Sequence, residues 1–109
     1  MRIGIDAMGG DHAPDEEVKG ALEACASLAE DDKIVLIGRQ DEIRARLNGS
    51  ANWDRHIVIV HADQVIAMGE SPVEALRGKP NSSIALLAQM HKQGEIDACI
   101  EQLGGWLLE

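Results

Sequence analysis

Short, continuous apolar runs that alternate with segments of helical periodicity constrain the fold of this 109-residue chain more than any other feature. The runs are Ile3–Ile5, Lys33–Gly38 and His56–His61, and Asp97–Ile100 begins a fourth. Runs without polar alternation are typical of parallel strands buried on both faces, because a sheet with one wet face alternates instead. Strands that alternate with helices form βαβ units. The pattern therefore predicts an α/β fold with a mostly parallel sheet.

The segments between the runs carry helix signals. Asp15–Glu30 has apolar residues at i, i+3, i+4 and i+7 spacing and follows Pro14, which suits the first helical position. Its charged residues are expected on a solvated face; they include Glu16, Glu17, Lys19 and Glu23. The pattern of Asp41–Leu47 predicts a second helix. Ser71 and Glu74 have the spacing of a capping box, and Asn81–Ser83 is expected to cap a further helix. Right-handed crossovers put helices on both faces, giving a Rossmann-like three-layer αβα sandwich, truncated at this length.

The loop between the first strand and the first helix combines a Gly-Gly turn with three titratable side chains. Gly9 and Gly10 let the backbone approach a ligand closely, and the first amides of the following helix lack internal partners. Asp6 ends the strand, at the edge where open α/β sheets bind ligands. Asp11 and His12 complete the loop. The loop predicts an anion site, and a plain strand-to-helix turn is the alternative.

Other loops are expected at the same sheet edge, because the carboxyl ends of parallel strands meet there. His61 and Asp63 follow the third strand, and Lys79–Ser83 opens a helix. The lysine would supply positive charge, and the hydroxyls of Ser82 and Ser83 would supply hydrogen-bond donors. Together with the glycine loop, these residues predict a phosphate site.

Two blocks of sequence resemble a known family. Residues Asp6–Pro14 read Asp-Ala-Met-Gly-Gly-Asp-His-Ala-Pro, which is similar to the N-terminal signature of the bacterial phosphate acyltransferases of phospholipid synthesis. A second block of that family is similar, in residues and in spacing, to His61-Ala62, Pro72–Arg77, Lys79 and Ser82-Ser83. Asp97–Ile100 resembles the start of the family's next strand. The resemblance covers roughly residues 1–100.

This resemblance implies reversible transfer of a fatty acyl group from acyl carrier protein to inorganic phosphate, giving acyl phosphate for phospholipid synthesis. It implies acyl carrier protein and phosphate as partners, a homodimer, peripheral membrane association through a downstream acyltransferase, a cytoplasmic location and no cofactor. Phosphate is already anionic, so we expect direct attack on the thioester, with His12 orienting phosphate or protonating the leaving thiolate. As our own hypothesis, we assign Asp11 and His12 to catalysis and Arg77 to partner docking, and we assign no residue to a metal. The residues that we assign to phosphate binding are Asp6, Gly9, Gly10, Lys79, Ser82 and Ser83.

The resemblance stops near residue 100. Family members continue with a Ser-Ala-Gly-Asn-Thr-Gly-Ala motif and a long further chain, whereas this sequence continues with Glu101–Glu109. We therefore expect residues 1–100 to form the N-terminal portion of an acyltransferase-like domain and residues 101–109 to form a divergent tail. We also expect little or no acyl phosphate formation by this chain alone. The tail is expected either to fold back over exposed apolar surface, with Gly104-Gly105 as a hinge, or to fray, and self-association or marginal stability is expected in both cases.

The composition limits the classes of partner that this chain is expected to bind. The net charge of −9 argues against nucleic acid and anionic membrane, and because acyl carrier protein is also acidic, Arg77 and Lys79 would have to supply a local basic patch. Cys25 and Cys99 form no C-x-x-C pair and read as buried thiols of a reducing compartment. No apolar run approaches the roughly 20 residues of a membrane span, and no signal peptide precedes the first strand.

Three alternatives to an active acyltransferase remain open. A nucleotide-binding domain is weakened by the absence of G-x-G-x-x-G and G-x-x-x-x-G-K-[ST] motifs. The second is a truncated, non-catalytic remnant that still folds in part or dimerises, or an anion-binding α/β module. A carboxylate–metal site is a third alternative, with ligands from Asp6, Asp11 and His12.

Overall fold

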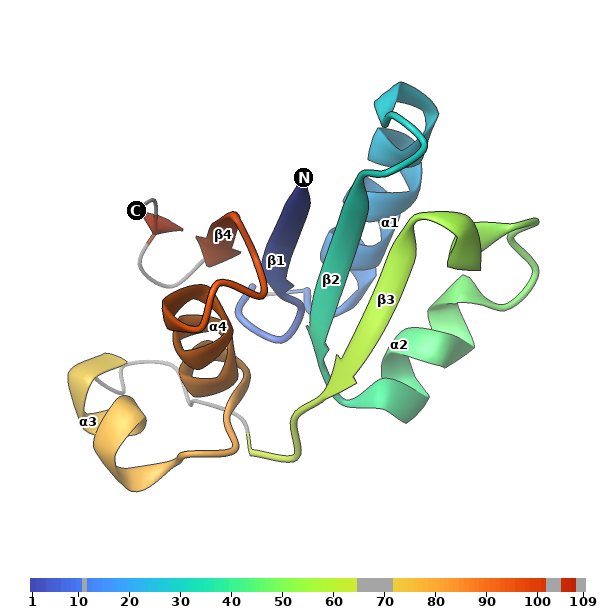
Figure 1. Ribbon diagram of the computed structural model, residues 1–109. Coiled ribbons are helices and arrows are strands. Elements are labelled where there is room, and N and C mark those ends of the chain that lie inside the picture. Colours follow the sequence, from blue (N-terminus) through green and yellow to red (C-terminus); the bar gives the residue numbers. More distant parts are fainter. Residues whose placement is uncertain (11, 65–71, 102–104, 108–109) are drawn as a thin grey trace.

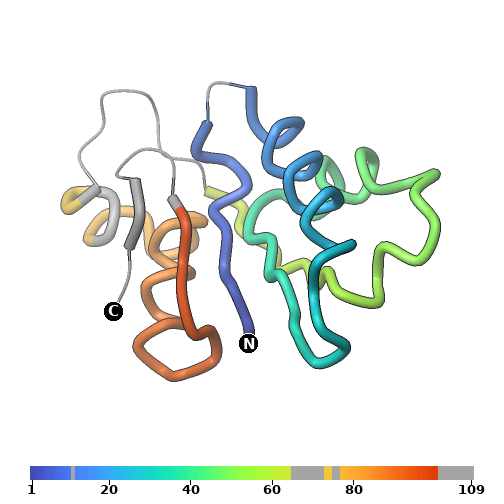
Figure 2. Tube along the Cα trace, turned by 90° about the horizontal axis from the view of Figure 1, so that it is seen from above, coloured from blue at the N-terminus to red at the C-terminus, as the bar shows by residue number. Residues whose placement is uncertain are grey.

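The computed structural model describes residues 1–10, 12–64, 72–101 and 105–107, and these form a single five-stranded sheet of order β3-β2-β1-β4-β5. The first four strands are parallel: β1 (Arg2–Asp6), β2 (Lys33–Gly38), β3 (Ile57–His61) and β4 (Ala98–Glu101). The short β5 (Gly105–Leu107) runs antiparallel to β4. In Figure 2, β1 lies in the middle of the molecule, with the chain from α1 to β3 on one side of it and α3, α4 and β4 on the other.

Within these described ranges, four helices connect the strands. They are α1 (Asp15–Ala24), α2 (Gln40–Leu47), α3 (Pro72–Gly78) and α4 (Ser83–Lys92). Short 3₁₀ turns follow at Cys25–Ser27 and Trp53–Arg55. Helices α1 and α2 cover one face of the sheet and α4 covers the other (Figure 1). This arrangement confirms the predicted α/β sandwich with a mostly parallel sheet.

The core is split into two layers by β2, whose residues alternate between them. Ile34 and Leu36 pack with Val18 and Ala21 of α1 and with the apolar residues of α2. Val35 and Ile37 pack with Leu87 of α4, together with Ala62, Ile96 and Cys99. These four apolar side chains of β2 are each at most 3% exposed, so the continuous apolar run does mark a strand buried on both faces.

The first helix is shorter than predicted. It ends at Ala24, and the chain passes through the 3₁₀ turn to Leu28, whose backbone is extended at φ −87° and ψ 144°. Leu28 still packs against the α1 side of the core, which explains why the apolar periodicity continued past the end of the helix. Pro14 is the N-cap of α1 rather than its first helical residue.

The predicted cap of α4 is confirmed, and part of the predicted capping box falls outside the described residues. Ser82 caps α4, because its Oγ accepts a hydrogen bond of 3.3 Å from the amide of Ala85. Gly94 lies just past α4 with a φ of +78°, a conformation that glycine adopts without strain. Ser71, the first residue of the predicted capping box, is not among the described residues. Within the described ranges, no helix is long and apolar enough to cross a bilayer.

Candidate functional site

The carboxyl end of β1 is organised by a buried carboxylate. Asp6 is 1% exposed, and its Oδ1 accepts hydrogen bonds from the amide of Met8 at 3.0 Å and from the hydroxyl of Ser83 at 2.5 Å. Burial raises the pKa of Asp6, and the bonds from Ser83 and Met8 lower it in part. Because Ser83 is the first residue of α4, this side chain pair fixes the start of α4 against the end of β1.

The glycine loop is held by a residue that the sequence placed on the solvated face. The amide of Gly10 donates a hydrogen bond of 3.1 Å to Oε2 of Glu17, the third residue of α1. Glu17 is only 5% exposed, so its predicted solvation is wrong. Its other oxygen, Oε1, is buried and has no hydrogen-bond partner in the described part of the chain. Burial is the main reason that the pKa of Glu17 is raised.

One signal in the sequence could have identified Glu17 as a residue that binds the loop before α1. A glutamate at the third helical position commonly reaches back to an amide before the helix, as in a capping box. Here the reach is longer, because the amide belongs to the glycine turn seven residues earlier. The carboxylate therefore occupies a donor that a bound anion would use.

The start of α4 is the second part of this edge. Ser82 and Ser83 are 0% and 2% exposed, so both hydroxyls lie inside the protein. The chain just after β3 is tied to the same place, since the amide of Gln64 donates to the carbonyl of Asn81 at 3.3 Å and the amide of Asn81 donates to Oε1 of Gln64 at 2.8 Å. Lys79 lies half-buried in the segment that leads into α4.

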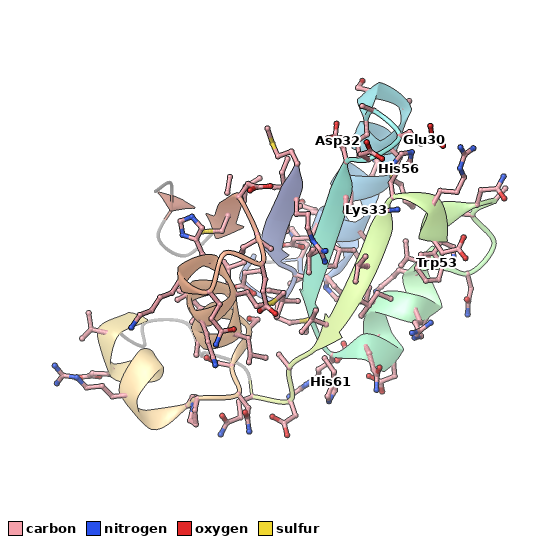
Figure 3. The ribbon with its side chains drawn as sticks, in the orientation of Figure 1. Glu30, Asp32, Lys33, Trp53, His56 and His61 are labelled. Carbon is pink, nitrogen blue, oxygen red and sulfur yellow. The ribbon has the colours of Figure 1, made fainter. Side chains whose placement is uncertain are left out.

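The remaining predicted residues are more exposed. His12 is exposed at the end of the glycine loop, and Arg77 is exposed in the last turn of α3. Asp11 is outside the described residues. His61 lies at the opposite end of β3 from His56 (Figure 3), and its Nδ1 accepts a hydrogen bond of 3.2 Å from the amide of Gln40, at the start of α2. His61 is thereby engaged in helix capping.

Neither the cysteines nor the acidic residues form a metal site in the described ranges. No group of three or more His, Cys, Asp or Glu side chains there is placed to hold a metal ion, although the alternative with Asp11 extends outside these ranges. Cys99 is buried and Cys25 is half-buried, and burial raises the pKa of the Cys25 thiol. A raised pKa disfavours the thiolate, so Cys25 is suited to packing rather than to nucleophilic chemistry.

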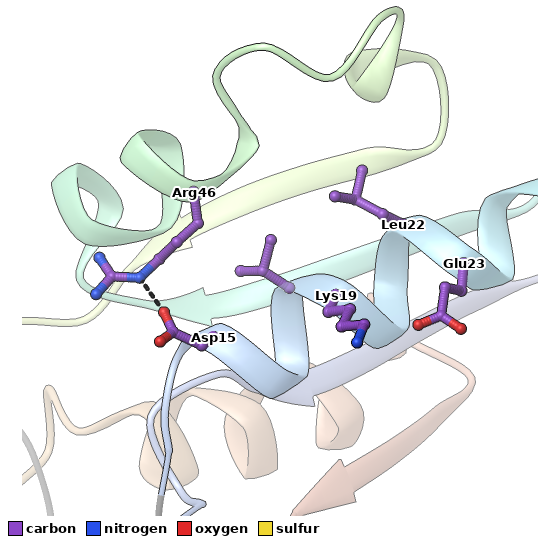
Figure 4. A pocket seen from close by; sticks show the side chains of 6 residues that line it. Asp15, Lys19, Leu22, Glu23 and Arg46 are labelled. Carbon is purple, nitrogen blue, oxygen red and sulfur yellow. Dashed lines mark hydrogen bonds and ion pairs between the residues drawn. The ribbon is translucent and has the colours of Figure 1, made fainter.

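A wide surface pocket of about 560 Å³ lies between α1 and α2 (Figure 4). An ion pair crosses it, with Nε of Arg46 at 2.5 Å from Oδ1 of Asp15. Lys19 and Glu23 add further charge to its lining. Both partners of the ion pair are exposed, and such pairs contribute little because water screens them. The pocket is thus an open, charged surface rather than an enclosed site.

The order of the strands explains why the glycine loop and the start of α4 meet. The chain passes from β1 to β2 and then to β3 on one side of β1, and it returns from β3 to β4 on the other side of β1. The carboxyl end of β1 is therefore a topological switch point, where open α/β sheets bind their ligands. These features define an open-sheet α/β protein with a candidate anion site at its switch point. Residues 1–102 match the family described as fatty acid synthesis protein, and the chain belongs to this family.

The individual relatives with similar sequences are named phosphate acyltransferases. The chain is 47% identical over 100 residues to a phosphate acyltransferase of Geobacillus thermodenitrificans and, to the same extent, to one of Bacillus cereus; each match covers 92% of this chain and 29% of the relative. A phosphate acyltransferase of Heliobacterium modesticaldum is 48% identical over 101 residues, 92% of this chain and 30% of the relative. The chain thus spans less than a third of the length of the curated relatives it matches.

Proposed function

We propose that this chain forms the N-terminal, phosphate-binding part of a phosphate acyltransferase, which transfers a fatty acyl group from acyl carrier protein to inorganic phosphate. The observation that carries the proposal is the meeting of the Gly9-Gly10 loop with the start of α4 at the switch point, joined by the bond from Ser83 to Asp6. The family and the names of the relatives support the reaction class. The division into residues 1–100 and a divergent tail 101–109 belongs to the same proposal.

Within this proposal, the residues assigned to phosphate binding have two different roles. Asp6, Ser82 and Ser83 are buried, so they hold the start of α4 beside the glycine loop, and direct contact with phosphate requires this edge to open. Donors for phosphate then come from the backbone amides of the glycine turn, with Lys79 supplying charge. Because the amide of Gly10 donates to Glu17, phosphate must displace that carboxylate to use it.

In the proposed reaction, a phosphate oxygen attacks the thioester carbonyl and the C–S bond then breaks, releasing the thiolate of the carrier. His12 orients phosphate or gives a proton to that thiolate, and Asp11 stands beside it in the sequence. Arg77, exposed on α3, offers positive charge to the acidic carrier. A homodimer, a cytoplasmic location and peripheral membrane association through a downstream acyltransferase complete the proposal.

Phosphate titration followed by amide NMR tests the anion site. We expect concentration-dependent shifts at residues 8–16, because the loop amides and the start of α1 lie there. Replacing Glu17 with alanine frees the Gly10 amide and should tighten phosphate binding about fivefold, the value of one hydrogen bond of about 1 kcal/mol. Glu16→Ala is the matched control, since Glu16 is exposed and its removal changes the charge equally.

Two results would contradict the proposal. Shifts scattered over the surface, with none at residues 8–16, would show that the glycine loop does not bind phosphate. Equal effects of Glu17→Ala and Glu16→Ala would show that general charge, not competition for the Gly10 amide, controls anion binding.

A further inference from the structure

An apolar groove of about 290 Å³ lies beside α1, on the face of the sheet that α1 covers. Ile3 and Ile5 of β1 and Ile100 of β4 form its floor, and Gly20 and Ala24 of α1 line its wall. Ile5 and Ile100 are direct neighbours in the parallel register. The two β1 isoleucines are only half-buried, so the expectation that β1 is buried on both faces is wrong on this side.

One residue, Glu17, links the groove to the glycine loop. Its lining is aliphatic except for Glu16 and Glu17, which belong to the first turn of α1. Glu17 lines the groove and also accepts the hydrogen bond from the amide of Gly10. Its Oε1 is buried and without a partner in the described ranges. One end of the apolar groove therefore lies at Glu17, whose Oε2 accepts the hydrogen bond from the candidate phosphate loop, and the groove extends along α1 to Ala24.

We propose that this groove holds the hydrocarbon tail of the fatty acyl substrate, with the reacting carbonyl at the Gly9-Gly10 loop. This inference rests on the proposed function, and it adds the location of the acyl chain. An unbranched apolar tail with one polar end matches a groove that is aliphatic along its length and polar only beside the loop. The volume is close to the lower end of the roughly 300–1,000 Å³ of small-molecule sites, so the groove takes part of a long chain.

Gly20 provides a way to fill the groove without disturbing the protein. A Cβ atom built on Gly20 meets no other atom within 4 Å, so a larger side chain at this position enters open space. Gly20→Leu should therefore occupy the groove and exclude part of the acyl chain. Gly20→Ala is the matched control, because it removes the same glycine from the helix interior and leaves most of the groove open. Glu23→Leu adds the same apolar side chain at an exposed position of α1 that does not line the groove.

The experiment uses isoleucine residues labelled at their δ1 methyl groups and a series of neutral acyl pantetheine thioesters as probes. Thioesters with longer chains should shift the methyl signals of Ile3, Ile5 and Ile100. The signals of Ile43 and Ile57, which are buried under the other part of the same layer, should not move. Gly20→Leu should weaken binding at least about tenfold, equivalent to keeping two methylene groups off apolar surface. Gly20→Ala and Glu23→Leu should bind as the unmodified chain does.

The methyl shifts of the unmodified chain test the proposal even if Gly20→Leu does not fold. Absence of shifts at Ile3, Ile5 and Ile100, or unchanged affinity in folded Gly20→Leu, would overturn it. So would shifts of these methyls with protein concentration alone, because a second copy of the chain would then fill the groove. Phosphate titration of the same samples separates this inference from the proposed function. Amide shifts at residues 8–16 without a groove response would refute the acyl site alone, and a groove response without those amide shifts would refute the phosphate site alone.

Discussion

Replacing Ser83 with alanine should destabilise the protein in a pH-dependent way. The hydroxyl of Ser83 donates to Oδ1 of Asp6 at 2.5 Å, and the two residues are 2% and 1% exposed. A hydrogen bond to a charged group contributes about 1.5–3 kcal/mol, and one between neutral groups about 0.5–1.5 kcal/mol. The variant should therefore lose about 1.5–3 kcal/mol where Asp6 is ionised and about 0.5–1.5 kcal/mol where it is protonated.

The direction of the pH effect follows from the burial of Asp6. Because burial raises the pKa of Asp6 in the folded state, its contribution to stability is present below the pKa of the unfolded chain and is lost as the pH rises through the folded pKa. The Ser83 bond opposes that rise in pKa. Ser83→Ala removes this opposition, so the pKa of Asp6 rises further and the variant loses stability over a wider pH range.

Urea unfolding of both proteins at neutral pH and at about pH 3, below the usual pKa of aspartate, measures this difference. For 109 residues with an unfolding entropy of about 2.1 cal/mol/K per residue, the loss expected where Asp6 is ionised corresponds to a fall in Tm of about 7–13 °C. Ser27→Ala, at an exposed position, is the matched control and should change stability by less than about 0.5 kcal/mol. A Ser83→Ala cost below about 0.5 kcal/mol, or the same cost at both pH values, would refute the reasoning.

Two further variants test the packing around this site. Gly4→Val should cost about 1–3 kcal/mol in urea unfolding, because a Cβ on Gly4 would lie 2.6 Å from Cδ1 of Ile96 and 2.7 Å from Cδ1 of Leu87; an unchanged midpoint would contradict the close packing of α4 on β1. Glu17→Gln should be more stable than the unmodified chain at neutral pH, and the gain should vanish in acid. The raised pKa of Glu17 means that its stabilising contribution is lost as the pH rises, so a gain independent of pH would be inconsistent with burial of the charge.

The strands and the sheet edge could be predicted from the sequence because both follow from local patterns. Continuous apolar runs such as Lys33–Gly38 occur in buried parallel strands, and parallel strands bring their carboxyl ends to one edge. The sequence thus placed Asp6 and Ser83 at the same edge. It could not show that they bond directly, because two residues 77 positions apart are joined only by the tertiary fold.

The burial of Glu17 and the groove beside α1 were missed for a related reason. Helical periodicity assigns Glu17 to the side of α1 away from the apolar stripe, but the glycine loop folds back onto that side and buries it. Similarly, an apolar run identifies β1 as a buried strand without indicating how far a helix extends over it. Ile3 and Ile5 stay half-exposed because α1 leaves the groove beside them open.

The tail offers a last prediction, because the part of it that the structure describes has a definite place. Gly105–Leu107 pairs with the outer edge of β4, with Trp106 opposite Ile100, so it extends the sheet rather than covering a face. Removing residues 102–109 should expose the backbone donors and acceptors of that edge, and unpaired edges promote association between chains. Sedimentation velocity over a range of concentrations should then show larger species for the shortened chain than for the full chain. If both sediment alike at every concentration, the pairing of β5 with β4 does not protect the edge.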